Sequence, residues 1–156
     1  MIVADTNVLV ALEVENECSD DARTLLRIDP EWRLPTLWRY EFANVMVTSV
    51  RTGRMGEDVA KAAMRHALGR FGPCEADVDW KAVLELALPL GLSAYDASFL
   101  AVARDLGVRL ISQDKALVAR SQSMAVGLKD YLGGRFMAGD AVSKGWSKKP
   151  KPKQGR

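Results

Sequence analysis

The sequence is poor in the residues that build disulfide frameworks, zinc sites and membrane spans. Its 156 residues include two cysteines and one histidine. Cys18 and Cys74 are too few for a disulfide framework and lack the spacing of zinc ligands, so we expect two reduced packing residues. The longest uncharged stretch, Leu86 to Tyr95, contains a proline and a glycine, whereas a bilayer-spanning helix needs roughly 18 apolar residues. We therefore expect no membrane association.

The sequence also lacks a secretory signal at its N-terminus. No basic segment precedes the first apolar residues, and Asp5 stands where the apolar part of a signal would be. Hydrophobic residues make up 48% of the chain and charged residues 27%, which is typical of a globular protein with a proper core. We expect a single folded domain in the cytoplasm.

Positive charge is concentrated at the C-terminal end of the chain. Residues 133–156 contain seven Lys and Arg against one acid, a net charge of +6, so residues 1–132 carry −4 within the overall +2. Prolines interrupt the last nine residues, Lys148 to Arg156, which contain no large apolar side chain. We expect a folded domain over 1–132 and a flexible basic tail over 133–156. The tail either contacts phosphates or only adds solubility.

Short apolar runs alternate with amphipathic segments along the folded part. We predict strands near 1–4, 32–34, 108–111 and 124–128, and helices near 8–12, 19–29, 37–53, 56–72, 78–88, 93–106 and 115–120. In the helix near 56–72, Val59, Ala62, Ala63 and Ala67 are expected to face inward. Nearly continuous apolar strands alternating with helices indicate an α/β/α sandwich around a mostly parallel sheet.

Four acids occupy positions where such a fold gathers its chemistry. Asp5 and Asp114 each follow a predicted strand, at the carboxyl edge of the sheet where ligands bind. Glu41 and Asp96 lie among apolar neighbours in predicted helices, with Arg39 as the only obvious nearby cation. If the four carboxylates converge, their repulsion requires a cation. Oxygen ligands favour Mg²⁺ or Mn²⁺, which would support phosphodiester hydrolysis.

Each acid also has a purely structural interpretation. Asp5 and Asp114 are placed to cap the helices that follow them. Asp96 comes three residues after Ser93 and can complete a capping box. Glu41 can lie on the exposed face of its helix.

Four segments around these acids resemble the motifs of PIN-domain nucleases, with the VapC-like toxins as the nearest branch. The segments are Met1-Ile-Val-Ala-Asp-Thr-Asn-Val-Leu-Val10, Pro35-Thr-Leu-Trp-Arg-Tyr-Glu-Phe-Ala-Asn-Val45, Leu92-Ser-Ala-Tyr-Asp-Ala-Ser-Phe-Leu-Ala101 and Leu110-Ile-Ser-Gln-Asp-Lys-Ala-Leu117. The resemblance covers about residues 1 to 130 and preserves the order of the motifs. It implies a Rossmann-like sheet and a metal-dependent endoribonuclease, usually a homodimer, that is produced with a small antitoxin.

The resemblance also assigns roles to individual residues. Asp5, Glu41, Asp96 and Asp114 become the catalytic and metal-binding acids, with direct ligation least certain for Asp114. Four further residues would support the pocket: Thr6, Asn7, Asn44 and Ser112. Among basic residues, Arg39, Arg51 and Arg54 are candidates for gripping RNA, since the net charge of the domain is negative.

Three alternatives stay open on the sequence. The same acids would serve an RNA-processing enzyme without an antitoxin, or a DNA nuclease or another phosphohydrolase. The fold could also serve as a noncatalytic binding module. The sequence leaves the RNA target, the cleavage position, the number of metals and the oligomeric state undetermined.

Overall fold

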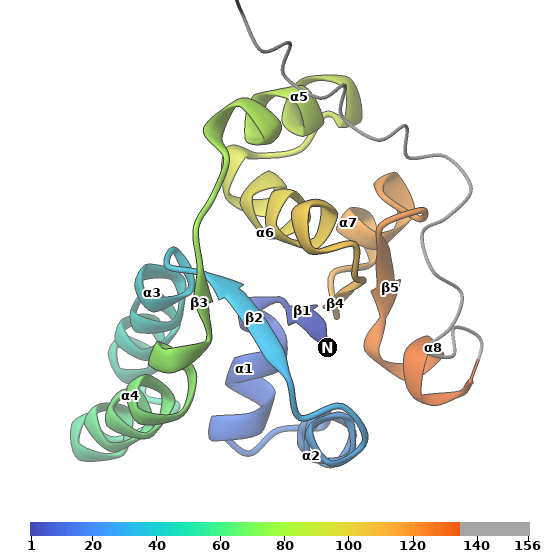
Figure 1. The fold of residues 1–156 in the computed structure, drawn as a ribbon. Coiled ribbons are helices and arrows are strands. Elements are labelled where there is room, and N and C mark those ends of the chain that lie inside the picture. The colour runs from blue at the N-terminus through green and yellow to red at the C-terminus, as the bar shows by residue number, and fades with distance from the viewer. Residues whose placement is uncertain (135–156) are drawn as a thin grey trace, which may run out of the picture.

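Strand β1 (Ile2–Ala4) lies at the centre of a five-stranded parallel sheet in the computed structural model, which describes residues 1–134 (Figure 1). The strand order is β3-β2-β1-β4-β5. The chain therefore builds outward from β1 on one side and then crosses to the other side, where Val3 pairs with Leu110 of β4. The switch point lies between β1 and β4, and their carboxyl ends form the crevice where ligands bind in open parallel sheets.

The remaining strands are short and the helices that connect them are longer. The strands are β2 (Trp32–Pro35), β3 (Glu75–Ala76), β4 (Leu110–Ser112) and β5 (Ala125–Gly127). The helices are α1 (Thr6–Glu13), α2 (Ser19–Ile28), α3 (Trp38–Arg51), α4 (Glu57–Phe71), α5 (Trp80–Leu90), α6 (Ala94–Leu106), α7 (Lys115–Arg120) and α8 (Leu128–Leu132), with a 3-10 turn over Gly72–Cys74.

Helices cover both faces of the sheet. Figure 1 shows α6 and α7 on one side and α1 with the α3–α4 pair on the other. Helix α6 packs on β1, β2 and β4, and α5 packs on α6. Residues 97–103 of α6 are all buried, because this helix is covered by the sheet on one side and by α5 on the other. The expected α/β/α sandwich is thereby confirmed.

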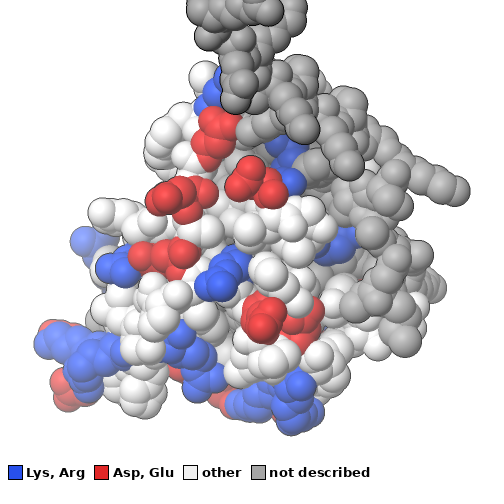
Figure 2. Space-filling model, viewed as in Figure 1, with Lys and Arg blue, Asp and Glu red and all other residues white. Residues whose placement is uncertain are grey.

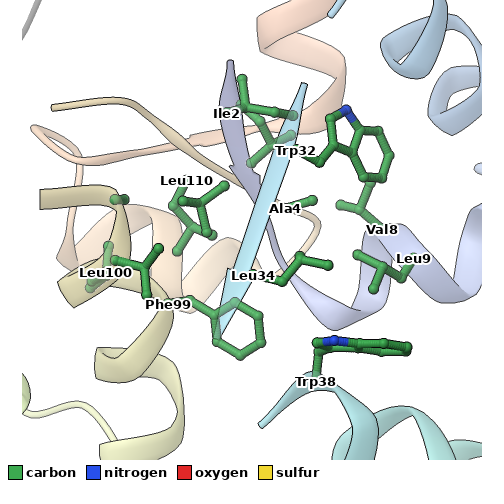
Figure 3. Close-up of a cluster of buried hydrophobic side chains, with 14 of the residues drawn as sticks. Ile2, Ala4, Val8, Leu9, Trp32, Leu34, Trp38, Phe99, Leu100 and Leu110 are labelled. Carbon is green, nitrogen blue, oxygen red and sulfur yellow. The ribbon is translucent and has the colours of Figure 1, made fainter. Parts of the chain in front are cut away.

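The core joins the sheet to α3 and α4 through aromatic rings. Trp32 stacks on Phe71 with 5.6 Å between ring centroids, and Trp38 meets Phe71 edge to face at 6.0 Å. Figure 3 shows Leu34 on the same side of β2 as Trp32 and Leu9, whereas Phe99 and Leu100 lie on the α6 side. Aromatic pairs of this kind stabilise beyond the burial of their area. They anchor the first turn of α3, which carries Glu41.

The structure differs from the sequence prediction at short elements and at one helix face. Strand β3 and helix α8 were not predicted, because two and five residues are too short for a periodic pattern. Helix α4 buries Ala60, Ala63, Ala67 and Phe71, whereas Val59 is exposed. The predicted inward face was therefore wrong at Val59, because the aromatic cluster around Phe71 fixes the rotation of the helix.

Residues 1–134 contain both cysteines and all the helices described above. Cys18 and Cys74 are free and partly buried, as predicted. No single helix in this part of the chain is long and apolar enough to cross a bilayer. Helices α5 and α6 reach that length and composition only when joined across a bend of 117°. Apart from two glycines, the predicted basic tail over 133–156 lies outside the described residues.

Candidate functional site

Asp5 stands at the switch point, directly after β1. Its backbone N–H donates to the Ile111 carbonyl at 2.9 Å, which continues the β1–β4 ladder up to the carboxylate. Its Oδ2 accepts hydrogen bonds from the Ser112 hydroxyl at 2.5 Å and from Asn7 Nδ2 at 2.7 Å. Although Asp5 occupies the N-cap position of α1, its side chain makes no capping hydrogen bond. The capping interpretation therefore does not describe Asp5.

Asn7 joins the two strand ends. In addition to Asp5, its Nδ2 donates to Ser112 Oγ at 3.1 Å. Its Oδ1 accepts from the Gln113 backbone N–H at 3.0 Å, and its carbonyl accepts from the Gln113 side chain at 3.3 Å. Sequence reasoning missed Gln113, whose neutral side chain gives no chemical signal; its position between Ser112 and Asp114 was the available clue. Together these bonds hold the carboxylate of Asp5 in one orientation.

Glu41 lies in the first turn of α3 and points back to α1. Its Oε2 accepts a hydrogen bond from the Thr6 hydroxyl at 2.5 Å, and its side chain is partly buried. Arg39, the one obvious cation nearby in sequence, does not neutralise it. The Arg39 guanidinium binds Glu75 of β3 through Nε at 2.5 Å and Nη2 at 2.9 Å. The Arg39 guanidinium is therefore occupied by a structural ion pair, which makes Arg39 a poor candidate for binding RNA phosphates.

Asp96 lies in the first turn of α6, and the capping box predicted from Ser93 is present in part. The Ser93 hydroxyl accepts from the Asp96 backbone N–H at 3.1 Å and donates to Asp96 Oδ2 at 2.7 Å. The cap fixes the position of Asp96, and it leaves the second carboxylate oxygen outside this bond. The capping role and a role in the site are therefore compatible.

The pKa shifts show that three of the four acids share one electrostatic environment. Burial together with the negative charges of Glu41 and Asp96 raises the pKa of Asp5 to about 6, against the lowering effect of the Ser112 hydrogen bond. Burial also raises the pKa of Glu41, as does the charge of Asp96. Carboxylates that repel one another in this way gain stability from a cation placed among them.

Asp114 is connected to this group through Ser112. The Asp114 backbone N–H donates to Ser112 Oγ at 2.9 Å, and the same hydroxyl donates to Asp5. Its own side chain is the N-cap of α7 and accepts from the N–H groups of Ala116 and Leu117 at 2.7 and 3.0 Å. Asp114 is exposed and does not contribute to the pKa shift of Asp5. The structure thus places it at the edge of the site.

Asn44 is the one predicted supporting residue for which no hydrogen bond to the site is seen within residues 1–134. It is exposed on α3, almost one turn after Glu41. Its side chain takes no part in the hydrogen bonds that join Asp5, Asn7 and Ser112.

The donor set fits a hard divalent cation in its chemistry. Asp5, Glu41 and Asp96 offer carboxylate oxygens, the ligands that Mg²⁺ and Mn²⁺ prefer. Among residues 1–134, no three acidic, histidine or cysteine side chains are arranged to hold one ion directly. Mg²⁺ does not require such a cage, because it commonly keeps several waters and takes only one or two protein carboxylates.

The fold and the site define a class of protein. A parallel sheet with order 3-2-1-4-5 carries three acids at the ends of β1 and the starts of α3 and α6, and residues 2–121 match the PIN domain family. The chain belongs to the PIN-domain family, as its four motifs predicted.

Within that class the chain is similar to VapC proteins of Pyrobaculum aerophilum. It is 30% identical over 123 residues to the protein named Ribonuclease VapC3, which covers 76% of this chain and 93% of the relative. It is 34% identical over 83 residues to Exonuclease VapC9, covering 53% and 62% of the two chains. The crystal structure of PAE2754 from the same organism superposes with a TM-score of 0.68 at 25% identity, covering 85% of this chain and 94% of the other.

Proposed function

We propose that this protein is a metal-dependent endoribonuclease and the toxin of a toxin–antitoxin pair. The observation that carries the proposal is the mutual electrostatic coupling of Asp5, Glu41 and Asp96 at the switch point of the sheet. Membership of the PIN-domain family and similarity to a protein named Ribonuclease VapC3 support a nuclease that acts on RNA.

The chemistry follows from what the three acids attract. Mg²⁺ or Mn²⁺, when bound by Asp5 and Asp96 with Glu41 beside them, would supply an activated water and would screen phosphate oxygens. The residues of this chain orient that centre. Asn7 and Ser112 hold Asp5, Thr6 holds Glu41, and Ser93 holds Asp96. Asp114 would act at the edge of the site, through water.

RNA binding needs basic residues, because residues 1–132 carry a net charge of −4. Lys and Arg gather over the α3–α4 pair at the lower left of Figure 2. Exposed members on these helices and on the turn between them include Arg51, Arg54 and Arg65. With Arg39 bound to Glu75, Arg51 and Arg54 remain the candidates for phosphate contacts.

Cleavage of total RNA by the purified chain, with and without Mg²⁺, tests the proposal. We expect cleavage with Mg²⁺, its loss on chelation, and its loss in Asp5→Asn and Asp96→Asn. Asp105→Asn is a matched control, because Asp105 is exposed near the far end of the helix that carries Asp96. Cleavage that survives in Asp5→Asn would contradict the proposed site.

Metal binding has a separate readout in thermal unfolding. A cation that binds the folded chain and not the unfolded chain raises the melting temperature, and the rise grows with the logarithm of its concentration above the Kd. We expect Mg²⁺ to raise the melting temperature of the wild type and of Asp105→Asn, and to leave Asp5→Asn unchanged. An equal rise in all three proteins would place the bound ion elsewhere.

A second mode of cleavage is favoured by one finding, the similarity to the protein named Exonuclease VapC9. Mapping the new 5′ ends distinguishes the two modes. Internal cuts at defined positions support an endonuclease, and progressive shortening from one end supports an exonuclease. A matched single-stranded DNA of the same sequence separates an RNA-specific enzyme from a DNA nuclease.

The partners and location belong to the same proposal. We expect a homodimer in the cytoplasm, with a small antitoxin covering the carboxylates. Sedimentation of the purified chain tests the dimer. Co-expression with the product of an adjacent small gene, where one is present, tests the antitoxin through inhibition of RNA cleavage.

A further inference from the structure

Few aromatic rings are exposed within residues 1–134, and two of them stand next to acids of the site in the sequence. Within residues 1–134 the aromatic side chains that are largely exposed are Tyr40, Trp80 and Tyr95, at 74%, 71% and 63%. Two of these three directly precede a carboxylate of the site. Tyr40 is followed by Glu41, and Tyr95 by Asp96.

Each ring belongs to the first turn of a helix that carries a carboxylate of the site. Tyr95 lies in the first turn of α6, which the Ser93 cap fixes, and Tyr40 lies in the first turn of α3, which Trp38 anchors in the core. Successive residues of a helix point about 100° apart. A residue that precedes an inward-facing carboxylate therefore flanks it and does not point into the core. No hydrogen bond holds either phenol group within residues 1–134.

A single exposed aromatic residue needs no explanation, but the position of these two suggests a ligand with flat apolar faces. Unpaired nucleobases stack on tyrosine rings, and stacking on aromatic side chains is the usual way in which proteins hold single-stranded RNA. Bases inside a duplex are already stacked on one another and cannot use such a platform.

We propose that Tyr95 and Tyr40 are stacking platforms that hold unpaired bases of the substrate next to the carboxylates. This inference rests on the proposed function and assigns two side chains of this chain to the binding of its substrate. The rings add binding energy that does not depend on charge, which the negatively charged domain needs.

Binding of a short single-stranded RNA, measured in an Asp5→Asn background so that it is not cut, tests the platforms. We expect Tyr95→Ala to raise the Kd about 5- to 150-fold, in line with the loss of one base–aromatic stack. Tyr40→Ala is expected to act in the same direction. Tyr95→Phe retains the ring and should bind like the background. Trp80→Ala is the matched control, because Trp80 is equally exposed but lies at the start of α5, and it should leave the Kd unchanged.

An RNA series in which one base at a time is removed locates the stacked base. We expect removal of one particular base to weaken binding when Tyr95 is present and to have little further effect in Tyr95→Ala. Such non-additivity shows that the ring and the base contact each other. In proteins that carry the wild-type Asp5, Tyr95→Ala should raise KM with kcat nearly unchanged, as loss of uniform binding predicts.

The failure of this inference is distinct from the failure of the proposed function. If the wild type cuts and binds RNA, but Tyr95→Ala and Tyr40→Ala do so equally well, the stacking proposal is wrong and the nuclease stands. If the wild type neither binds nor cuts RNA, both are wrong. Unchanged melting temperatures of the variants exclude misfolding as the cause of weaker binding.

Discussion

Asp5 is a carboxylic acid held where its charge is unfavourable. Burial and the nearby charges of Glu41 and Asp96 raise its pKa from 3.8 to about 6. The folded state therefore binds the proton on Asp5 more tightly than the unfolded state does. Stability from this proton is present below pH 3.8 and is lost as the pH rises through 6. At neutral pH the metal-free protein carries this cost in full.

Replacing Asp5 by Asn should stabilise the metal-free protein at neutral pH. The rise in the pKa of Asp5 from 3.8 to about 6 corresponds to a gain of ~2–3 kcal/mol in the free energy of unfolding of Asp5→Asn at pH 7.5. The gain should shrink towards zero at pH 4, where the wild-type carboxyl is protonated in the folded state. Urea unfolding in EDTA at both pH values measures it. A gain that is equal at the two pH values would show that repulsion is not its source.

The Ser112 hydroxyl works in the opposite direction. Its hydrogen bond lowers the pKa of Asp5 and so favours the charged form that binds a cation. Ser112→Ala should raise the pKa of Asp5 above 6 and move the acidic limb of the pH–activity profile to higher pH. Ser123→Ala, at an exposed serine in the loop before β5, is the control and should leave the profile in place. An unmoved profile in Ser112→Ala would contradict the role of this hydrogen bond.

Helix α6 combines a structural cap with a functional residue in one turn. Ser93 accepts from the Asp96 N–H and also donates to the carboxylate. Ser93→Ala should therefore lower the free energy of unfolding by about 1 kcal/mol through loss of the cap. It should also lower the rate of RNA cleavage, because the Asp96 carboxylate loses its fixed orientation. Thermal unfolding and cleavage rates measure the two effects, and a loss of stability with full activity would reduce Ser93 to a cap alone.

The secondary structure could be predicted where an element is long or strongly apolar. Helices α3, α5 and α6 were placed within a few residues of their bounds, because their apolar residues recur at helical spacing. The rotation of α4 could not be predicted, since Val59 and Ala60 fit the apolar pattern equally well. Because the Phe71 ring packs against Trp32 and Trp38, α4 is rotated so that Ala60 is buried and Val59 is exposed. Only the packed core contains that information.

Positive charge is distributed unequally along the chain and is concentrated at its C-terminal end. Residues 1–134 contain the entire described core, and residues 135–156 carry a net charge of +6. Removal of residues 135–156 should leave the melting temperature almost unchanged, since no described core residue is lost. It should weaken RNA binding and reduce the slope of log K against log salt by up to about 4, the value for six charges on a single strand. An unchanged slope would limit this segment to a role in solubility.

The local sequence was sufficient to predict four of the five described strands, the serine and aspartate that cap α6 and α7, and the four acidic motifs, because apolar periodicity and helix-start residues act over a few neighbouring positions. It could not show that Ser112 would bind Asp5, that Asn7 would bind Ser112, or that Arg39 would bind Glu75 instead of Glu41. Those contacts join residues far apart in the chain. The contacts of Ser112 with Asp5 and Asn7 depend on the crossing of the chain from β3 to β4, which places the end of β4 beside the end of β1.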